Sequence, residues 1–246
     1  MIRGLYIAAT GMLAESARQD VIANNLANVT TTGFKRDVST STTFGGLLVS
    51  NLGLPGAPVV GELNLGTQVG GIATIDRQGS LRATGNPLDV ALVGEGWITV
   101  DAPGGRRYTR DGQLQVDGSG RLLAADGSPV VGTSGRPISL DPQGGDVTIA
   151  ADGTVSQDGA VRGRIRIAAL DAASLRKEGT NLVSGTEAGP GSAVVRQGYL
   201  EASNVNTVTE MVRLIEVMRA FEANQKAALA HGETLQEAVT KVGAVG

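Results

Sequence analysis

The sequence lacks cysteine and contains few aromatic residues. Its 246 residues include no cysteine and one histidine, and aromatic residues make up 3% of the chain. Disulfides and cysteine-ligated metal sites are therefore excluded, and stability must come from packing. Hydrophobic residues make up 41%, so the core must be largely aliphatic. A core without aromatic anchors disfavours a small-molecule pocket, and we expect neither a cofactor nor a small-molecule substrate.

The chain also lacks an excess of positive charge and any long apolar run. Lys and Arg number 21 against 24 Asp and Glu, a formal net charge of -3, which gives no electrostatic reason to expect nucleic acid as a partner. No run reaches the roughly 18 apolar residues of a membrane span. Glu15, Arg18 and Asp20 interrupt the N-terminal segment, so we expect no cleaved signal peptide.

Heptad spacing marks both ends of the chain. Alternating steps of three and four residues predict a long amphipathic helix at each end, and the two helices are expected to pair with each other, with neighbouring copies, or with both. The alternative is that each helix packs separately on a globular core. The predicted positions are Leu5, Ala9, Met12, Ser16, Gln19, Ala23 and Leu26, then Met211, Leu214, Met218, Phe221, Gln225, Ala228, Gly232, Leu235, Val239 and Val242.

Turn signals dominate the middle of the chain. Asp-Gly pairs such as those in "RDGQ", "VDGSG" and "ADGT" separate short runs such as "WITV" and "VTIA", which is typical of antiparallel hairpins. We therefore predict an α+β fold. Its expected parts are a helical coiled-coil domain from residues 1–36 with 200–246, an extended connector over 37–69, and a β-rich domain over 70–199.

Motifs for catalysis or metal binding are weak. His231 has only Glu233 and Glu237 nearby in sequence, which is a poor zinc set. Ser174 and Lys177 match a serine–lysine spacing of acyl enzymes, but the companion motifs of those enzymes are missing. We therefore predict no metal site and no catalytic residue, and the chain is not expected to be an enzyme.

A carbohydrate-active or carbohydrate-binding β domain is the alternative from another functional class. The carboxylates to inspect for it are Asp89, Glu95, Asp111 and Asp126. Glycoside hydrolysis needs two carboxylates about 5 to 10 Å apart across a cleft. Most of these four lie in expected turns, so the alternative has little support.

Long motifs from three regions resemble one protein family. The N-terminal "GLYIAATGM" and "NNLANVTTTGFKR", the central "TGNPLDVALVGEGWITV" and "YTRDGQLQVDGSGRLLAADGSPVVG", and the C-terminal "QGYLEASNVNTVTEMVRLIEVMRAFEANQKA" are similar to motifs of the bacterial flagellar rod and hook proteins. The motifs stand in the family's order, which makes the resemblance specific.

The resemblance implies a self-assembling structural subunit of the periplasm-spanning basal-body rod. Paired terminal helices would form the inner tube, and the β domain would lie outside it. The implied partners are other rod subunits and copies of the chain itself. The implied route is export through the flagellar type III apparatus. "GEGW" and "SPVVGTSGRPISL" favour the proximal rod type, whereas "MIRGLYIAATGM" and "QGYLEASNVN" resemble the distal type, which is the alternative.

The stretch from Asn24 to Arg36 is the expected joint between the tube and the outer domain. Its asparagines can bond backbone groups where the helix ends, and Gly33 permits the left-handed turn that commonly stops a helix. We expect assembly contacts at Leu5, Met12, Leu26, Asn25, Asn28, Gly33, Phe34, Leu214, Phe221 and Leu235.

Overall fold

The computed structural model describes residues 2–43, 47–50, 59–63 and 66–243. The chain divides into two compact units. The helical unit comprises residues 1–26, 37–73 and 207–246, and the β unit comprises residues 27–36 and 74–206. A long helix at each end of the chain and a central antiparallel β region confirm the predicted α+β class. Residues 27–36, which we expected in the helical domain, cluster with the β unit instead.

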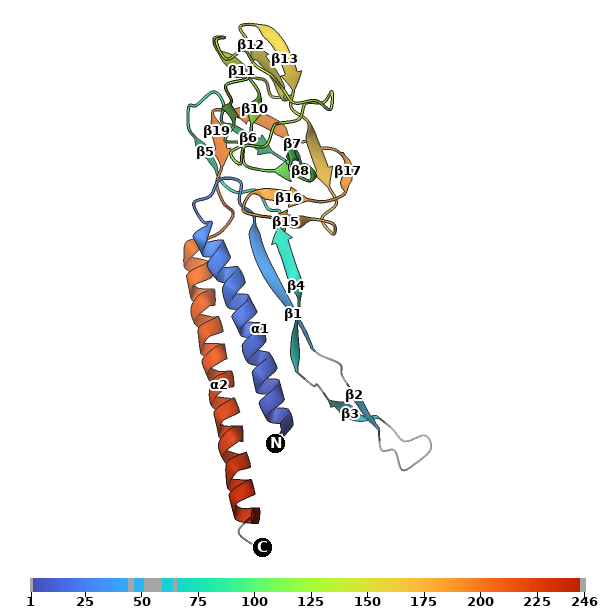
Figure 1. Cartoon of the computed structure of the whole chain (residues 1–246), viewed down its shortest axis with the longest axis vertical. Helices are drawn as coiled ribbons and strands as arrows, with labels where there is room; N and C mark the ends of the chain where they lie inside the picture. The colour runs from blue at the N-terminus through green and yellow to red at the C-terminus, as the bar shows by residue number, and fades with distance from the viewer. Residues whose placement is uncertain (1, 44–46, 51–58, 64–65, 244–246) are drawn as a thin grey trace. The chain divides into compact units, whose positions relative to one another are not determined.

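The two terminal helices are α1, Ile2–Ala27, and α2, Thr207–Gly243. They lie side by side (Figure 1), and two of the α1 glycines touch side chains of α2. Glu210 lies in the first turn of α2, where a negative charge is favourable to the helix dipole. In the described part of the chain, no helix combines the length and apolarity that crossing a bilayer requires.

The first four strands after α1 form two separate two-stranded sheets. Antiparallel pairs form between β2, Leu47–Ser50, and β3, Val59–Leu63. A second two-stranded sheet joins β1, Arg36–Thr43, to β4, Thr67–Ile75. The described residues of the expected connector over 37–69 therefore lie in strands except Gly66, and residues 44–46, 51–58 and 64–65 of that range lie outside the described residues.

Short antiparallel strands build the β unit. Its largest sheet has six strands in the order β15-β16-β8-β7-β14-β17, and β11, β12 and β13 form a three-stranded sheet. Two-stranded sheets pair β9 with β10, β18 with β6, and β19 with β5. The strands are β5 Leu81–Ala83, β6 Val90–Val93, β7 Trp97–Ala102, β8 Gly105–Thr109, β9 Gln115–Val116, β10 Leu122–Leu123, β11 Val147–Ile149, β12 Thr154–Gln157, β13 Ala160–Arg164, β14 Ile167–Leu170, β15 Arg176–Glu178, β16 Leu182–Ser184, β17 Glu187–Pro190, β18 Val194–Gln197 and β19 Tyr199–Glu201.

The larger core cluster of the β unit is aliphatic, as the composition predicts, and a smaller one contains Trp97 and Tyr108. One predicted turn, "ADGT", connects β11 to β12, and its Gly153 has a φ of 85°, which glycine adopts without steric cost. The strands joined by such turns, together with the segments between them, supply the inward residues of the larger cluster. Its buried members are Val90, Leu92, Ile98, Val100, Leu114, Leu122, Ala124, Val130, Ile138, Leu140, Ile149, Val155, Ile165 and Val195.

Candidate assembly elements

The segment that follows α1 leaves the helix through a local turn. α1 ends at Ala27, and the backbone N–H of Thr31 donates to the carbonyl of Asn28 at 3.2 Å. The Thr31 hydroxyl also donates to the Asn28 side-chain oxygen at 3.2 Å. Such short-range bonds compete with continued helix. The helix therefore ends before Gly33, although Gly33 does adopt the expected left-handed conformation, with a φ of 67°.

Gly33 is required by a close backbone approach inside the β unit. A Cβ built there would lie 2.4 Å from the backbone nitrogen of Asp111 and 2.5 Å from the carbonyl carbon of Arg110. The Gly33 N–H donates to the carbonyl of Glu201 at 2.8 Å. Any side chain at position 33 would push this segment away from the backbone of Arg110 and Asp111. Glycine at position 33 therefore allows the segment to pack directly on that backbone.

A buried ion-pair network holds the next residues. Lys35 Nζ lies 2.7 Å from Glu201 Oε1, with side chains only 2% and 1% exposed, and 3.4 Å from Asp76 Oδ1. Arg110 Nη1 lies 3.5 Å from Glu201 Oε2, and the Gly79 N–H donates to Glu201 Oε1 at 2.9 Å. Buried charges are tolerated only when they are paired and hydrogen-bonded, which these contacts provide for Glu201.

Phe34 and Lys177 form a second contact that holds residues 33–36 in the β unit. Phe34 is buried, and Lys177 Nζ lies 3.6 Å from the centre of its ring. The same ammonium donates to the carbonyl of Lys35 at 2.6 Å. A cation over an aromatic face is attractive, more so when it is shielded from water. The lysine of the serine–lysine motif therefore has a structural partner, and Ser174 Oγ accepts the N–H of Thr186 at 2.8 Å.

Asn204 joins the N-terminal and C-terminal motifs. Its side-chain oxygen accepts the N–H of Arg36 at 2.7 Å, and its side-chain nitrogen donates to the carbonyls of Ile75 and Arg77, both at 2.8 Å. Its own N–H donates to the carbonyl of Phe34 at 3.4 Å. We call Gly33–Arg36, Arg110, Glu201 and Asn204 the anchor.

Asp111, beside the anchor, accepts three hydrogen bonds on its carboxylate. Its carboxylate accepts the Thr32 hydroxyl at 2.7 Å, the Gln113 N–H at 3.1 Å and the Asn181 amide at 2.7 Å. Burial raises the pKa of Asp111, and these three hydrogen bonds oppose that rise. A carboxylate held in this way serves to attach Thr32.

Small residues of α1 face α2 in an antiparallel pair. A Cβ added to Gly4 would lie 2.5 Å from His231 Nε2, and one added to Gly11 would lie 2.9 Å from Asn224 Nδ2. The two contacts are seven residues apart on each helix. The residue number rises along α1 as it falls along α2, so the two helices run antiparallel. The chain's single histidine therefore packs in the helix pair.

The buried face of the helix pair is shifted from the predicted one. On α1 the buried positions neighbour the predicted ones, and Leu5 is 38% exposed. Glycine and alanine occupy the contact because they allow helices to approach closely. On α2 the predicted Leu214, Phe221 and Leu235 are half-buried. The buried helix residues are Ala8, Ala14, Val21, Ile22, Asn25, Glu210 and Val217.

The remaining predicted assembly residues occupy varied environments. Met12 and Leu26 are half-buried. Asn25 donates its side-chain N–H to the carbonyl of Asp37 at 2.8 Å and accepts the N–H of Asp37 at 2.9 Å. Asn25 thus fixes the start of β1 within the helical unit. These placements describe the isolated chain, and the assembly roles of the residues stay predictions.

Comparison with known proteins matches three segments to flagellar families. Residues 5–35 match the family described as "Flagella basal body rod protein", residues 91–157 match "Flagellar hook protein FlgE/F/G D1 domain", and residues 196–240 match "Flagellar basal body rod FlgEFG protein C-terminal". The anchor residues Gly33–Lys35 lie inside the first of these matches, and Glu201 and Asn204 lie inside the last.

Full-length relatives carry the same family name. The flagellar basal-body rod protein FlgF of Caulobacter vibrioides is 36% identical over 251 residues, covering 100% of both chains. The FlgG of Agrobacterium fabrum is 36% identical over 92% of this chain and 94% of its own, and the FlgG of Bacillus subtilis is 33% identical over 97% and 98%. The chain belongs to the flagellar basal-body rod protein family.

In this rod-family chain, the four carboxylates of the carbohydrate alternative have separate structural surroundings. Asp89 and Asp111 are buried, whereas Glu95 and Asp126 are exposed. Asp89 accepts the Asn86 side-chain amide at 3.0 Å. Asp126 accepts the Ser128 hydroxyl in a turn. Among the residues that the structure describes, no three metal-ligating side chains gather in one place.

Sequence reasoning missed the charged members of the anchor and the glycines of the rod-family helix pair. Lys35, Arg110 and Glu201 are charged residue types that are almost never fully buried unless paired, and no local spacing in the sequence shows which of them pair. The available signal was the presence of Lys35 and Glu201 inside the two terminal motifs. Gly4 and Gly11 have the heptad spacing, but each lies one residue before a predicted position, Leu5 and Met12.

Proposed function

We propose that this chain is a structural, non-enzymatic subunit of the flagellar rod and that it is of the proximal, FlgF type. The observation that carries the FlgF type is the end-to-end alignment with the Caulobacter FlgF, which covers 100% of both chains. The motifs "GEGW" and "SPVVGTSGRPISL" support it. The distal FlgG type is the second candidate, because the Agrobacterium FlgG has the same 36% identity.

The subunit assembles in the basal body with other rod components and with copies of itself. The predicted contacts at Leu5, Met12 and Leu26 of α1, and at Leu214, Phe221 and Leu235 of α2, are part of this proposal. The exposed or half-buried state of these side chains leaves area for neighbouring subunits. Heterologous contacts that do not close produce an open helical array, which is the form a rod requires.

We place Asn25, Asn28, Gly33 and Phe34 in the joint rather than in direct contact between subunits. The hydrogen bonds of both asparagines are made within the chain, and Gly33 and Phe34 are buried. Their proposed contribution is to fix the path of the chain after α1. Export through the flagellar type III apparatus, without a cleaved signal peptide, completes the proposal.

Locating the subunit along the rod tests the FlgF assignment. A chain carrying a small epitope in the exposed turn at Gly159 would be expressed in place of the native copy, and purified basal bodies would be labelled with antibody-bound gold. We expect label at the end of the rod nearer the cell interior. Label at the outer end would mean that the chain is of the FlgG type. Basal bodies without label would contradict the rod assignment. Mass spectrometry of the incorporated chain would show an intact N-terminus if no signal peptide is cleaved.

A further inference from the structure

Large apolar side chains remain exposed along one side of α2. Steps of three, four and three residues separate them, and they are between 47% and 71% exposed. We call this set the α2 stripe: Val208, Met211, Ile215 and Met218. Alternating steps of three and four place residues on one face of a helix and fit a second helix lying along it. The stripe lies outside the face that α2 presents to α1, where Val217 and Glu210 are buried.

α1 carries a second exposed set on the side away from α2. Tyr6 is 53% exposed and Leu13 is 71% exposed, with the half-buried Ala9 between them. We call these three residues the α1 stripe. Their spacing is again three and four residues, but a small residue separates two large ones. An unbroken row of large side chains can interdigitate with such an alternation.

We propose that the α2 stripe of one copy binds the α1 stripe of a second copy, and this inference rests on the proposed rod function. The two stripes differ from each other and occur on one chain, so each copy offers both halves of the contact. A heterologous contact of this kind can repeat without closing. Copies that all point the same way along a rod bring the two stripes together antiparallel, because α1 and α2 run antiparallel within each copy.

One antiparallel alignment matches every member of the α1 stripe. It places Tyr6 beside Met218, Ala9 beside Ile215, and Leu13 beside Met211. Relative to the pairing of Gly4 with His231 inside each copy, this alignment is displaced by eleven residues. At a helix rise of 1.5 Å per residue, the second copy is shifted by about 16 Å along the helix axis.

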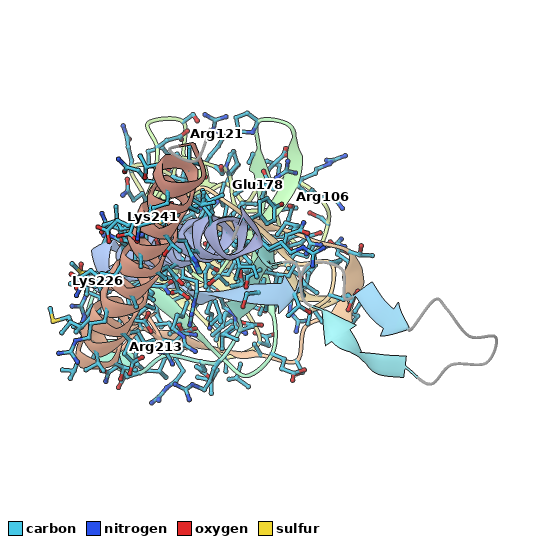
Figure 2. All side chains as sticks on the ribbon, turned by 90° about the horizontal axis from the view of Figure 1, so that it is seen from below. Arg106, Arg121, Glu178, Arg213, Lys226 and Lys241 are labelled. Carbon is cyan, nitrogen blue, oxygen red and sulfur yellow. The ribbon has the colours of Figure 1, made fainter. Side chains whose placement is uncertain are left out.

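Charge complementarity supports the same alignment at its end. Arg3 precedes Tyr6 on α1, and Glu222 follows Met218 on α2. Both residues are exposed, and within the described residues neither forms an ion pair in its own chain. Opposite charges at the edge of an apolar helix contact set partner choice and orientation. The basic residues Arg213, Lys226 and Lys241 also project from α2 (Figure 2), but they lie outside the four positions of the α2 stripe.

Cysteine cross-linking between two co-expressed copies tests the alignment. The chain has no cysteine of its own, so one copy would carry Leu13→Cys and the other Met211→Cys, and basal bodies would be isolated and oxidised. We expect a covalent dimer, because disulfides form when Cβ atoms come within about 4.5 Å. The matched control pairs Leu13→Cys with Met218→Cys. It is about 10 Å out of register, and we expect about tenfold less dimer from it.

Charge reversal supplies an independent readout. Arg3→Glu alone and Glu222→Arg alone should each lower the cross-linking yield several-fold, and the double variant should restore it. Equal yields from the in-register and out-of-register pairs would overturn the inference. A cross-link from position 211 to a different rod protein, or the absence of any cross-link at position 211, would also overturn it. In each of those cases the presence of the chain in basal bodies would leave the proposed function intact. Absence of the wild-type chain from basal bodies would instead contradict the proposed function.

Discussion

At the scale of single residues, the anchor depends on a carboxylate that is enclosed by cations. Glu201 contacts Lys35 and Arg110, and all three side chains are buried. Removing one partner from a buried pair is more damaging than removing the whole pair, because the remaining charge keeps its desolvation cost. Glu201 is therefore the residue of the β unit at which a nearly isosteric change should have the largest effect.

We predict that Glu201→Gln lowers the free energy of unfolding of the β unit by about 3 to 5 kcal/mol. The amide is similar in size but leaves the ammonium of Lys35 without its closest counter-charge. Urea unfolding of the full chain, followed by tryptophan fluorescence, would measure the loss. Trp97 is the only tryptophan and is buried in the β unit, so the signal reports that unit alone.

Glu178→Gln is the matched control for this substitution. Glu178 pairs with Arg107 at 2.6 Å, and its side chain is 44% exposed. Figure 2 labels Glu178. Exposed ion pairs contribute little to stability because water and salt screen them, so the unfolding midpoint should hardly move. If the two substitutions lowered the free energy of unfolding equally, the buried ion pairs of the anchor would contribute no more to the stability of the β unit than an exposed pair does.

At the scale of elements, the sequence predicts the helices better than their contact face. Heptad spacing places helices at both ends, and turn chemistry places strands between them, because these signals are local. The contact face of α1 differs because it uses Gly4, Ala8 and Gly11, each one residue before a predicted heptad position, so the spacing was right and the register was not. The anchor was not predicted because it joins residues 33–36 to residue 201, and no local pattern reports such a contact.

We predict that Gly11→Leu weakens the helix pair. A side chain there would meet Asn224, which already lies 2.9 Å from the position of an added Cβ, so the helices must separate. Circular dichroism at 222 nm during heating would show loss of helical signal at a lower temperature. Gly232→Ala is the control, because a Cβ at Gly232 meets nothing within 4 Å, and replacing glycine in a helix by alanine stabilises it by about 1 kcal/mol. If both variants shifted the helical transition in the same direction, close packing at Gly11 would be refuted.

At the scale of the whole molecule, the β unit is completed by segments from both sides of the chain. Residues 27–36 precede the helical-unit strands in sequence yet cluster with residues 74–206. They supply the Gly33 N–H to Glu201, the Thr32 hydroxyl to Asp111, and the buried ring of Phe34. The expected β-rich domain over 70–199 omits both this segment and Glu201. A fragment with those bounds would lack the anchor.

Two fragments test whether residues 27–36 belong to the folded β unit. The fragment 27–206 retains the anchor, and the fragment 37–206 differs only by the loss of residues 27–36. We predict that the longer fragment unfolds cooperatively, whereas the shorter one is destabilised by several kcal/mol, since loss of a buried Phe alone costs about 3 to 5 kcal/mol. Loss of Lys35 also leaves Glu201 with a single, more distant cation, at 3.5 Å. Urea titration with Trp97 fluorescence would measure both midpoints. Coincident midpoints would show that residues 27–36 are a passive tether. A lower midpoint for the shorter fragment would place the folding boundary of the β unit at the end of α1, at Ala27.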